Sequence, residues 1–416
     1  MLKKTVFSLM LFILPIITYA SDNTSFAVGN KFYDTLEEAI LNASSTDTVE
    51  LFSNAILSNP LIINKVVNID LNGNDISAPS TVFLVQDGTL NISGKGTIKE
   101  NEPYNGAIRV IGKTSETEEK YSTLNIGKNV TLEGWSGIFI THTSNKSHGV
   151  YVNLDGTINA VDDTTGANGA GIYVNGSIQH VESSPVINIT DSAKITSTGT
   201  GLYIAGYSTF NVGNAYIEGN HSGIGIKAGK LNIDGATVVC NGKDSTPTEG
   251  YNNGMNASGT AIQIESNSGY AGNIVLNISA GNIKSKNSSV IYEYIGKGDT
   301  TRVKSISISG GTFTSEADKN VFLLSNSFKN THQKFINGGK FTSNPENYLK
   351  PGYITNLENN YYDVSKSVMA VFSIKSDNNN NILSKILIVT VLIILGVIFY
   401  LKRLKIASLF KTIFNR

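Results

Sequence analysis

Short alternations of apolar and polar residues recur along the middle of the chain. Between about 60 and 345, an apolar–Asn–apolar triplet is followed by a Gly-containing turn and then by a β-branched or aromatic residue. Alternation with a period of two places the apolar side chains on one face of a strand and the Asn on the other. The pattern predicts short, half-buried strands. Copies begin at Leu90, Leu124, Val152, Ile187, Phe210, Leu231 and Leu276, with weaker ones at Ile306 and Lys334.

A second short strand follows the middle copies. Its sequences are GIFI, GIYV, GLYI, GIGI and AIQI, and the tightest spacings between copies of the repeat are 21 and 23 residues. Short strands at this period, separated by Gly and Asn turns, are typical of a solenoid whose coils stack strand on strand. A β-sandwich would need longer strands and no such period. The sequence therefore predicts an all-β chain folded as a parallel β-helix.

Two columns of residues follow when the copies are aligned. We expect the Asn of each triplet to stack at strand spacing, about 4.8 Å, so that the amides hydrogen-bond as a ladder. The other column holds one small residue per coil, which indicates an inward corner and makes Cys240 a small buried thiol. The Asn column is Asn91, Asn125, Asn153, Asn188, Asn211, Asn232 and Asn277; the small column is Gly134, Ala160, Ser197, Gly219, Cys240, Ser285, Ser315 and Ser343, and Glu100 breaks it in the first coil.

The outward residues of the second strands form a third column. This column is the candidate binding site. Its members are Arg109, Phe139, Tyr173, Tyr203, Gly225 and Gln263, with Trp135 on an adjoining turn. An exposed aromatic strip indicates a binding surface. Rings on consecutive coils suit stacking on an extended neutral glycan, with Arg109 and Gln263 supplying hydrogen bonds. The alternative is that connecting segments such as 162–170 fold over the rings and bury them.

The two ends of the chain indicate a membrane protein. Residues 1–20 have two Lys, an apolar run and a terminal Ala20, which is typical of a cleaved signal peptide. Residues 382–401 form an apolar stretch long enough to cross a bilayer as a helix. Basic residues follow it directly, so the positive-inside rule places 402–416 in the cytoplasm and the rest outside the cell.

These features divide the chain into seven segments. Thr35-Leu-Glu-Glu38 is a capping box that opens a helix over 35–43, suited to cover the first coil. The tail 402–416 has helical apolar spacing and could lie on an anionic leaflet or dock to a partner. The predicted order is a signal peptide (1–20), an N-terminal cap (21–47), the β-helix (48–344), a C-terminal cap (345–376), a polar stalk (377–381), the transmembrane helix (382–401) and the basic tail.

Composition and charge narrow the function. The chain has 33 basic and 33 acidic residues, but 21–381 carries all the acids with 25 of the bases, a net charge of −8. The chain has no excess of basic residues that would favour binding to nucleic acid. An acidic ectodomain is also poorly suited to bind an anionic polysaccharide. The single Cys excludes a disulfide framework and a Cys-based zinc site. Asp162-Asp163 and the pair His142 and His148 lack further ligands at metal spacing, so no metal or cofactor is predicted.

Parts of the sequence also resemble a known protein superfamily. FYDTLEEAI, VVNIDLNGNDI, ISGGTF and NGGKFTSNPENYLKPGY look like bacterial surface proteins of the right-handed parallel β-helix, or pectate-lyase-like, superfamily, over about 30–355. The resemblance implies a right-handed helix. Enzymes of that superfamily use clustered Asp residues with calcium and an Arg, or several Asp residues as acid and base. Here Arg109 and Arg302 are about six coils apart, about 29 Å, too far to share a site.

Non-enzymatic adhesion or glycan binding at the cell surface is therefore the leading expectation. The expected partners are the membrane and glycans or a host surface, with no nucleic acid. A surface polysaccharide lyase or glycoside hydrolase is the alternative, and a purely structural envelope protein is a third possibility.

Overall fold

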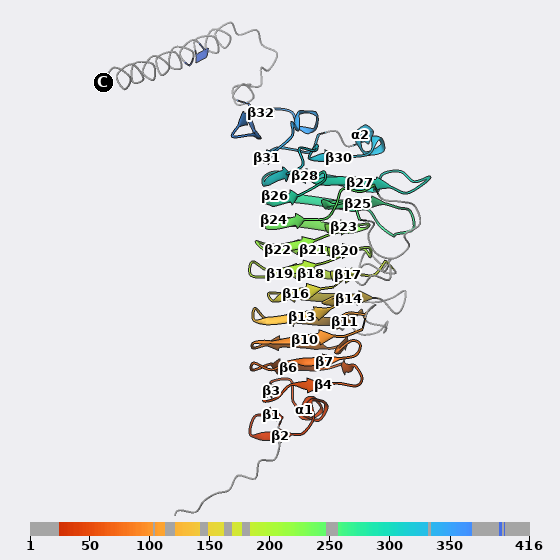
Figure 1. Cartoon of the computed structure of the whole chain (residues 1–416), viewed down its shortest axis with the longest axis vertical. Coiled ribbons are helices and arrows are strands. Elements are labelled where there is room, and N and C mark those ends of the chain that lie inside the picture. Colours follow the sequence, from red (N-terminus) through yellow and green to blue (C-terminus); the bar gives the residue numbers. More distant parts are fainter. Residues whose placement is uncertain are drawn as a thin grey trace, which may run out of the picture.

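The computed structural model is an elongated all-β rod built from stacked parallel strands (Figure 1). It describes residues 25–102, 105–112, 121–141, 149–161, 169–176, 184–246, 257–331 and 334–367, together with Val391, Leu392 and Leu395. Most strands pair in parallel with the strand three places earlier in the chain, so three columns of strands build up side by side. These stacked parallel sheets are compatible with the predicted solenoid.

Two of the three columns belong to one sheet of 23 strands, which we call sheet A. The long strands β24 and β26 run through both columns and join them. The first column contains β3 (Thr48–Leu51), β6 (Val66–Asp70), β9 (Thr89–Ser93), β12 (Ser122–Ile126), β15 (Val150–Leu154), β18 (Val186–Ile189), β21 (Thr209–Val212), β24 (Gly229–Cys240), β26 (Ile274–Ser285) and β28 (Val303–Ile308). The second contains β4 (Ala55–Ile56), β7 (Ile76–Ala78), β10 (Gly96–Glu100), β13 (Val130–Gly134), β16 (Thr157–Ala160), β19 (Lys194–Ser197), β22 (Tyr216–Gly219), the later halves of β24 and β26, β29 (Thr312–Ser315) and β31 (Lys340–Phe341).

The third column is a separate sheet of ten strands, sheet B. Its strands alternate between side chains that point into the rod and side chains that point away from it. The inward ones, such as Ile138, Ile172 and Leu202, are fully buried in the core. Sheet B contains β5 (Leu61–Ile63), β8 (Phe83–Gln86), β11 (Ile108–Ile111), β14 (Ile138–Thr141), β17 (Ala170–Val174), β20 (Thr200–Ile204), β23 (Ser222–Ile226), β25 (Thr260–Ser266), β27 (Ile291–Ile295) and β30 (Phe322–Leu323).

Both ends of the rod are covered by other elements. At one end β1 (Phe26–Val28) pairs antiparallel with β2 (Lys31–Tyr33) and β3, and α1 (Leu36–Asn42) buries its apolar side. Thr35 caps α1 by accepting a hydrogen bond from the Glu38 amide at 3.2 Å, as the capping box predicts. The other end carries α2 (Asn326–Thr331), the 3₁₀ turn η1 (Glu346–Tyr348) and the hairpin of β32 (Tyr353–Glu358) and β33 (Tyr361–Lys366). One buried apolar core runs from Phe26 to Val364.

The predicted Asn ladder is confirmed and is one residue longer than expected. Each amide nitrogen donates to the side-chain oxygen of the Asn one coil earlier, at 2.6–2.9 Å, from Asn277 back to Asn91. Asn91 donates in turn to Asn68 at 2.7 Å, and Asn68 donates to the backbone oxygens of Ser45 and Asp47. All donors point the same way, so the ladder runs in one direction along sheet A.

The predicted corner of small residues is confirmed for seven of its eight positions, while Ser343 follows the end of β31 and lies in no strand. Gly134, Ala160, Ser197, Gly219, Cys240, Ser285 and Ser315 are in register on consecutive strands. Cys240 is a fully buried free thiol, and burial raises its pKa to about 11.

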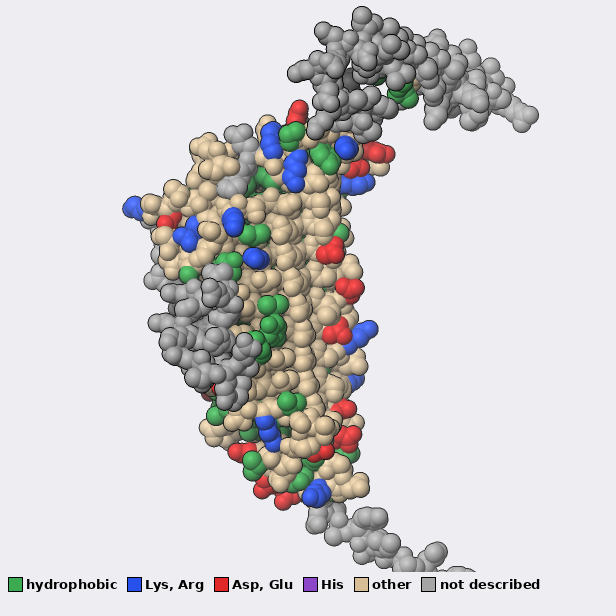
Figure 2. All heavy atoms as spheres, turned by 180° about the vertical axis from the view of Figure 1, so that it is seen from behind, with side chains coloured by type: hydrophobic (Ala, Val, Ile, Leu, Met, Phe, Trp, Pro, Cys, Tyr) green, Lys and Arg blue, Asp and Glu red, His purple; other side chains and the backbone are tan. Residues whose placement is uncertain are grey.

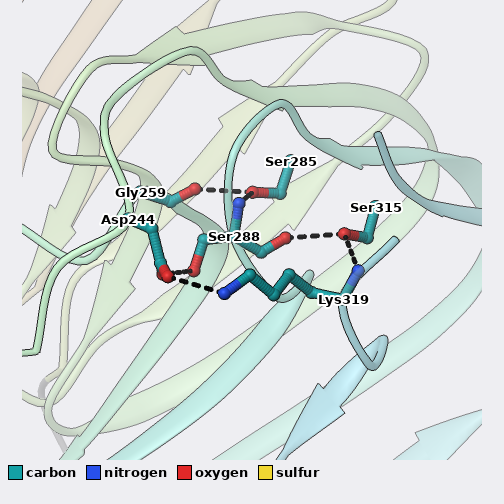
Figure 3. A network of polar contacts seen from close by, with 6 residues as sticks. All are labelled: Asp244, Gly259, Ser285, Ser288, Ser315 and Lys319. Carbon is teal, nitrogen blue, oxygen red and sulfur yellow. Dashed lines mark hydrogen bonds and ion pairs between the residues drawn. The ribbon is translucent and has the colours of Figure 1, made fainter. Parts of the chain in front are cut away.

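Hydroxyl groups of this corner tie neighbouring turns together, as Figure 3 shows. Ser285 donates to the Gly259 carbonyl at 2.6 Å, and Ser315 donates to the Ser288 carbonyl at 2.9 Å. Asp244 accepts from Ser288 at 2.5 Å and pairs with Lys319 at 3.1 Å. Because Asp244 and Lys319 are about half exposed, this network connects coils rather than forming an enclosed reaction site.

In the parts of the chain that the structure describes, there is no helix long and apolar enough to cross a membrane. The predicted signal peptide, polar stalk and basic tail lie outside the described residues, as does the predicted span 382–401 apart from Val391, Leu392 and Leu395.

Candidate functional site

The candidate site lies on the outer side of sheet B, where the sequence places an outward column. The strand register confirms this column: Arg109 pairs with Phe139, Phe139 with Tyr173, and Tyr173 with Tyr203. Tyr203 then pairs with Gly225 and Gly225 with Gln263, so Gly225 ends the run of rings. All six predicted positions therefore share one face.

The aromatic rings of the column stack on one another. The centroids of Phe139 and Tyr173 lie 4.8 Å apart with nearly parallel planes, and those of Tyr173 and Tyr203 lie 4.4 Å apart. Trp135 leans against this stack, with its ring centroid 5.3 Å from that of Tyr173. The spacing follows the strand separation, as expected for side chains on consecutive parallel strands.

The expectation that this strip is exposed is wrong. Trp135 is 7% exposed, Tyr173 6% and Tyr203 2%, and with Ala170 and Ala205 they form an apolar cluster outside the main core. Tyr270, from the connection after β25, and Phe139 pack against this outer cluster. An outward strand position faces solvent only where nothing packs over the sheet. Large rings bury much apolar area, so covering them stabilises a second core.

A lysine lies where Gly225 leaves the column without a side chain. Lys227 is fully buried, and its ammonium nitrogen lies 5.5 Å from the ring centroid of Tyr203 and 4.7 Å from that of Tyr270. It also donates to the Tyr270 hydroxyl at 3.1 Å. Cations over aromatic faces are stabilised by the ring quadrupole. Burial is the main cause that raises the pKa of the Tyr203 hydroxyl well above its usual value.

Lys227 forms an enclosed ion pair with Glu265 on the next strand. The ammonium nitrogen lies 3.1 Å from Oε1 of Glu265, and the two side chains are 0% and 3% exposed. The second carboxylate oxygen, Oε2, is buried without a hydrogen-bond partner. Gln263, on the same strand, is fully buried: Oε1 accepts from Ser258 at 2.6 Å, whereas Nε2 is buried without a partner. Such buried, unused polar groups are rare and call for an explanation.

Arg109 and Phe139 form the open end of the stack. Both side chains are of intermediate exposure, and the Arg109 guanidinium carbon lies 5.6 Å above the Phe139 ring centroid. Nε of Arg109 is buried and has no hydrogen-bond partner. Burial lowers the pKa of the guanidinium from its usual value, but an Arg stays charged at neutral pH. This end therefore offers a ring edge and a partly exposed guanidinium.

Glu100 is a second buried carboxyl close to Trp135. It sits at the inward corner where other coils have a small residue, and a side chain at Gly134 would collide with it. Burial raises its pKa from 4.5 to about 8, although backbone amides of Trp135, Asn105 and Ser136 oppose the shift. Glu100 is thus protonated at neutral pH. Because it is only 3% exposed, it does not face an open cleft.

Sequence reasoning missed Lys227, Glu265 and Tyr270. The sequence does contain a signal for Lys227 and Glu265. In GIGIK and AIQIE each of them lies two residues after a member of the outward column, Gly225 or Gln263. Two residues along a strand return to the same face, so a lysine and a glutamate on neighbouring strands meet there. Tyr270 belongs to an irregular connection, and no periodicity predicts where its ring packs.

Among the described residues, no group of three or more His, Cys, Asp or Glu side chains could hold a metal ion. Asp162-Asp163, His142 and His148 lie outside the described ranges. A groove of about 430 Å³ lies at the N-terminal cap between α1 and the β4–β5 connection, away from the outer cluster. None of the six column positions lines it.

Compared with family models, with curated proteins and with solved structures, this chain matches nothing.

Proposed function

We propose that the protein is a non-enzymatic cell-surface protein that binds neutral glycans through the open end of the outer cluster. In this proposal the rod is a right-handed parallel β-helix, anchored by the helix 382–401 after removal of 1–20, with the described rod outside the cell. The resemblance of its repeats to bacterial surface β-helix proteins supports this assignment, as does the segregation of apolar, basic segments to the two ends.

The half-exposed pair of Arg109 and Phe139 carries the binding proposal. Of the four rings first considered as a platform, Phe139 alone is of intermediate exposure, while Trp135, Tyr173 and Tyr203 hold it in place from behind. The apolar face of a sugar packs well on an aromatic side chain, and a rigid planar donor beside it fixes orientation. The partly exposed guanidinium of Arg109 is such a donor. Gln263 lies fully buried beyond Gly225 and is no longer part of the proposed contact.

The net charge of −8 over 21–381 disfavours a polyanionic ligand. The face in Figure 2 shows Asp and Glu side chains spaced along one edge of the rod, with Lys or Arg side chains among them.

Binding of the full-length protein to an array of neutral glycans tests the proposal. We expect Phe139→Ala to lower affinity at least tenfold, because the apolar ring edge that the sugar contacts is removed, with a smaller loss for Arg109→Lys. Tyr151→Ala is the matched control, since Tyr151 is 39% exposed on sheet A. The proposal is wrong if no neutral glycan binds, or if Phe139→Ala binds as well as the unchanged protein while keeping its melting temperature.

A glycoside hydrolase or lyase is the second candidate, favoured by one observation. The pKa of Glu100 near 8 gives a carboxylic acid that keeps its proton at neutral pH, as a general acid requires. Its enclosure weighs against this role. Turnover of a bound glycan that disappears in Glu100→Gln would select the enzyme over the binding protein.

A further inference from the structure

Lys227 and Glu265 form an unusually enclosed pair of reactive groups. The amine nitrogen of Lys227, directly after β23, and the nearer carboxylate oxygen of Glu265, on the paired strand β25, lie 3.1 Å apart, and both side chains are almost fully buried. The rings of Tyr203 and Tyr270 flank the amine. The remaining oxygen of Glu265 has no hydrogen-bond partner. The two groups are therefore held in contact and shielded from water, and one carboxylate oxygen has no hydrogen-bond partner.

We propose that Lys227 and Glu265 condense to an intramolecular amide cross-link between their side chains. Within the pair, the ammonium passes one proton to the carboxylate, which leaves a neutral amine and a carboxylic acid. The amine nitrogen then bonds to Cδ of Glu265, the bond from Cδ to one oxygen breaks, and that oxygen departs as water with two protons. One is the proton that the carboxyl already carries, and the other comes from the nitrogen. No oxidant, reductant or further reactant is needed.

Tyr270 is placed to move the second proton. Its hydroxyl accepts a hydrogen bond from the Lys227 nitrogen at 3.1 Å. The hydroxyl can take the proton that the nitrogen must lose as the amide forms, and it can release its own proton toward the leaving oxygen. Tyr203, which also interacts with the Tyr270 hydroxyl, keeps this hydroxyl next to the amine. Tyr270 acts here as a proton carrier and is unchanged at the end.

Two physical effects favour the amide over the ion pair. Burying two charges is costly before their attraction is counted, and a neutral amide avoids that cost. Groups held in contact react as if at very high concentration, which lowers the barrier to their condensation. Enclosure also keeps out the water that would hydrolyse the product. The cross-link would tie β23 to β25 across the longest connection of the solenoid, 241–259.

The exposed pair of Lys284 and Glu316 is an internal control. Its nitrogen and oxygen lie 2.5 Å apart, closer than in the buried pair, but the side chains are 43% and 41% exposed. Solvent stabilises both charges there and exchanges freely with the carboxylate. Proximity alone would cross-link this pair as well, whereas enclosure predicts reaction at Lys227 only.

Peptide mapping of the purified, denatured full-length protein by mass spectrometry tests the proposal. We expect one branched peptide joining the segments around Lys227 and Glu265, lighter than their sum by one water molecule, and trypsin that fails to cut after Lys227. Lys227→Met should give separate linear peptides of unmodified mass. The peptides around Lys284 and Glu316 should stay unlinked.

Three outcomes would overturn the proposal. Unmodified peptides around Lys227 and Glu265 in the unchanged protein would show an ordinary ion pair. A branched peptide lighter by one ammonia molecule would make the buried amide of Gln263 the acceptor in place of Glu265. Linkage at the exposed control pair as well would show that enclosure is not the cause. All three are read from the unchanged protein, so they do not depend on whether a variant folds.

Discussion

The fold disfavours the ionised form of the Glu100 side chain. Neighbouring coils place Gly, Ala or Ser at this inward corner, where a carboxylate cannot be hydrated. The backbone amides of Trp135, Asn105 and Ser136 offset only part of this cost. Burial accordingly raises the pKa of Glu100 from 4.5 to about 8. The folded protein therefore holds a proton that the unfolded chain releases at neutral pH.

This proton makes stability depend on pH in a stated direction. Below about pH 4.5 both states are protonated, and the stabilising difference is fully present. Between pH 4.5 and 8 only the unfolded carboxyl ionises, so the free energy of unfolding falls as pH rises, by up to about 5 kcal/mol. Glu100→Gln should remove this slope. Urea unfolding of both proteins at pH 5 and pH 9 measures it, and equal slopes in the two proteins would refute the shift.

Cys240 should behave as an inert thiol. It lies between Gly219 and Ser285 in the small-residue corner, is 0% exposed, and has a pKa of about 11. Because the thiolate is the reactive form, we expect labelling by a thiol reagent at pH 7.5 to proceed at least a hundredfold more slowly in the native protein than in urea. Comparable rates in both would show that the corner assignment is wrong.

At the residue scale, the sequence predicts which side chains share a face but not how far that face is covered. Arg109, Phe139, Tyr173 and Tyr203 align as expected, because strand periodicity fixes their direction. The burial of Tyr203 depends instead on partners in irregular connections, such as Tyr270. Contacts of this kind leave no periodic signal in the sequence. The sequence alone therefore predicts an exposed aromatic platform at the place where the structure has a second core.

At the scale of elements, the Asn ladder links one coil to the next through side chains alone. Asn153 is a typical rung: it donates to Asn125 at 2.7 Å and accepts from Asn188 at 2.9 Å. Hydrogen bonds between stacked amides align their dipoles, and cooperative strengthening is expected along such a chain. The ladder adds to the backbone pairing that holds β12, β15 and β18 together.

Removing one rung should cost more than removing an isolated surface amide. We expect Asn153→Ala to lower the free energy of unfolding by about 1–2 kcal/mol, since two hydrogen bonds are lost. Asn282→Ala is the matched control, because Asn282 is an exposed Asn on β26 outside the ladder, and it should change stability by less than about 0.5 kcal/mol. Urea unfolding compares the two variants. Equal effects would mean that the ladder adds nothing to stability.

The predictability of elements follows their regularity. The strands around Leu90, Leu124 and Leu231 are found where the triplets predict them, and the cap helix begins at Leu36 after Thr35. The helix α2 and the antiparallel pairing of β31 with β33 have no counterpart in the sequence reasoning. Both lie where the sequence repeat weakens. The structure there is determined less by the local sequence than by the need to cover the last coil.

At the scale of the whole molecule, one core runs through the described rod and a smaller cluster lies outside it. The main core extends from the N-terminal cap to the final hairpin, so each coil is supported by its neighbours on both sides. The outer cluster of Trp135, Tyr173 and Tyr203 covers the middle of sheet B. Rod and cluster together hold Phe139 and Arg109 at the surface.

The stability of Tyr203→Ala tests this account most directly. Tyr203 is 2% exposed and stacks 4.4 Å from Tyr173, so truncation should lower the free energy of unfolding by about 3 kcal/mol or more. Tyr151→Ala, at a position 39% exposed, should cost less than about 1 kcal/mol. Urea unfolding of the three proteins under identical conditions gives the comparison. A Tyr203→Ala protein as stable as Tyr151→Ala would mean that the rings form an open strip and not a second core.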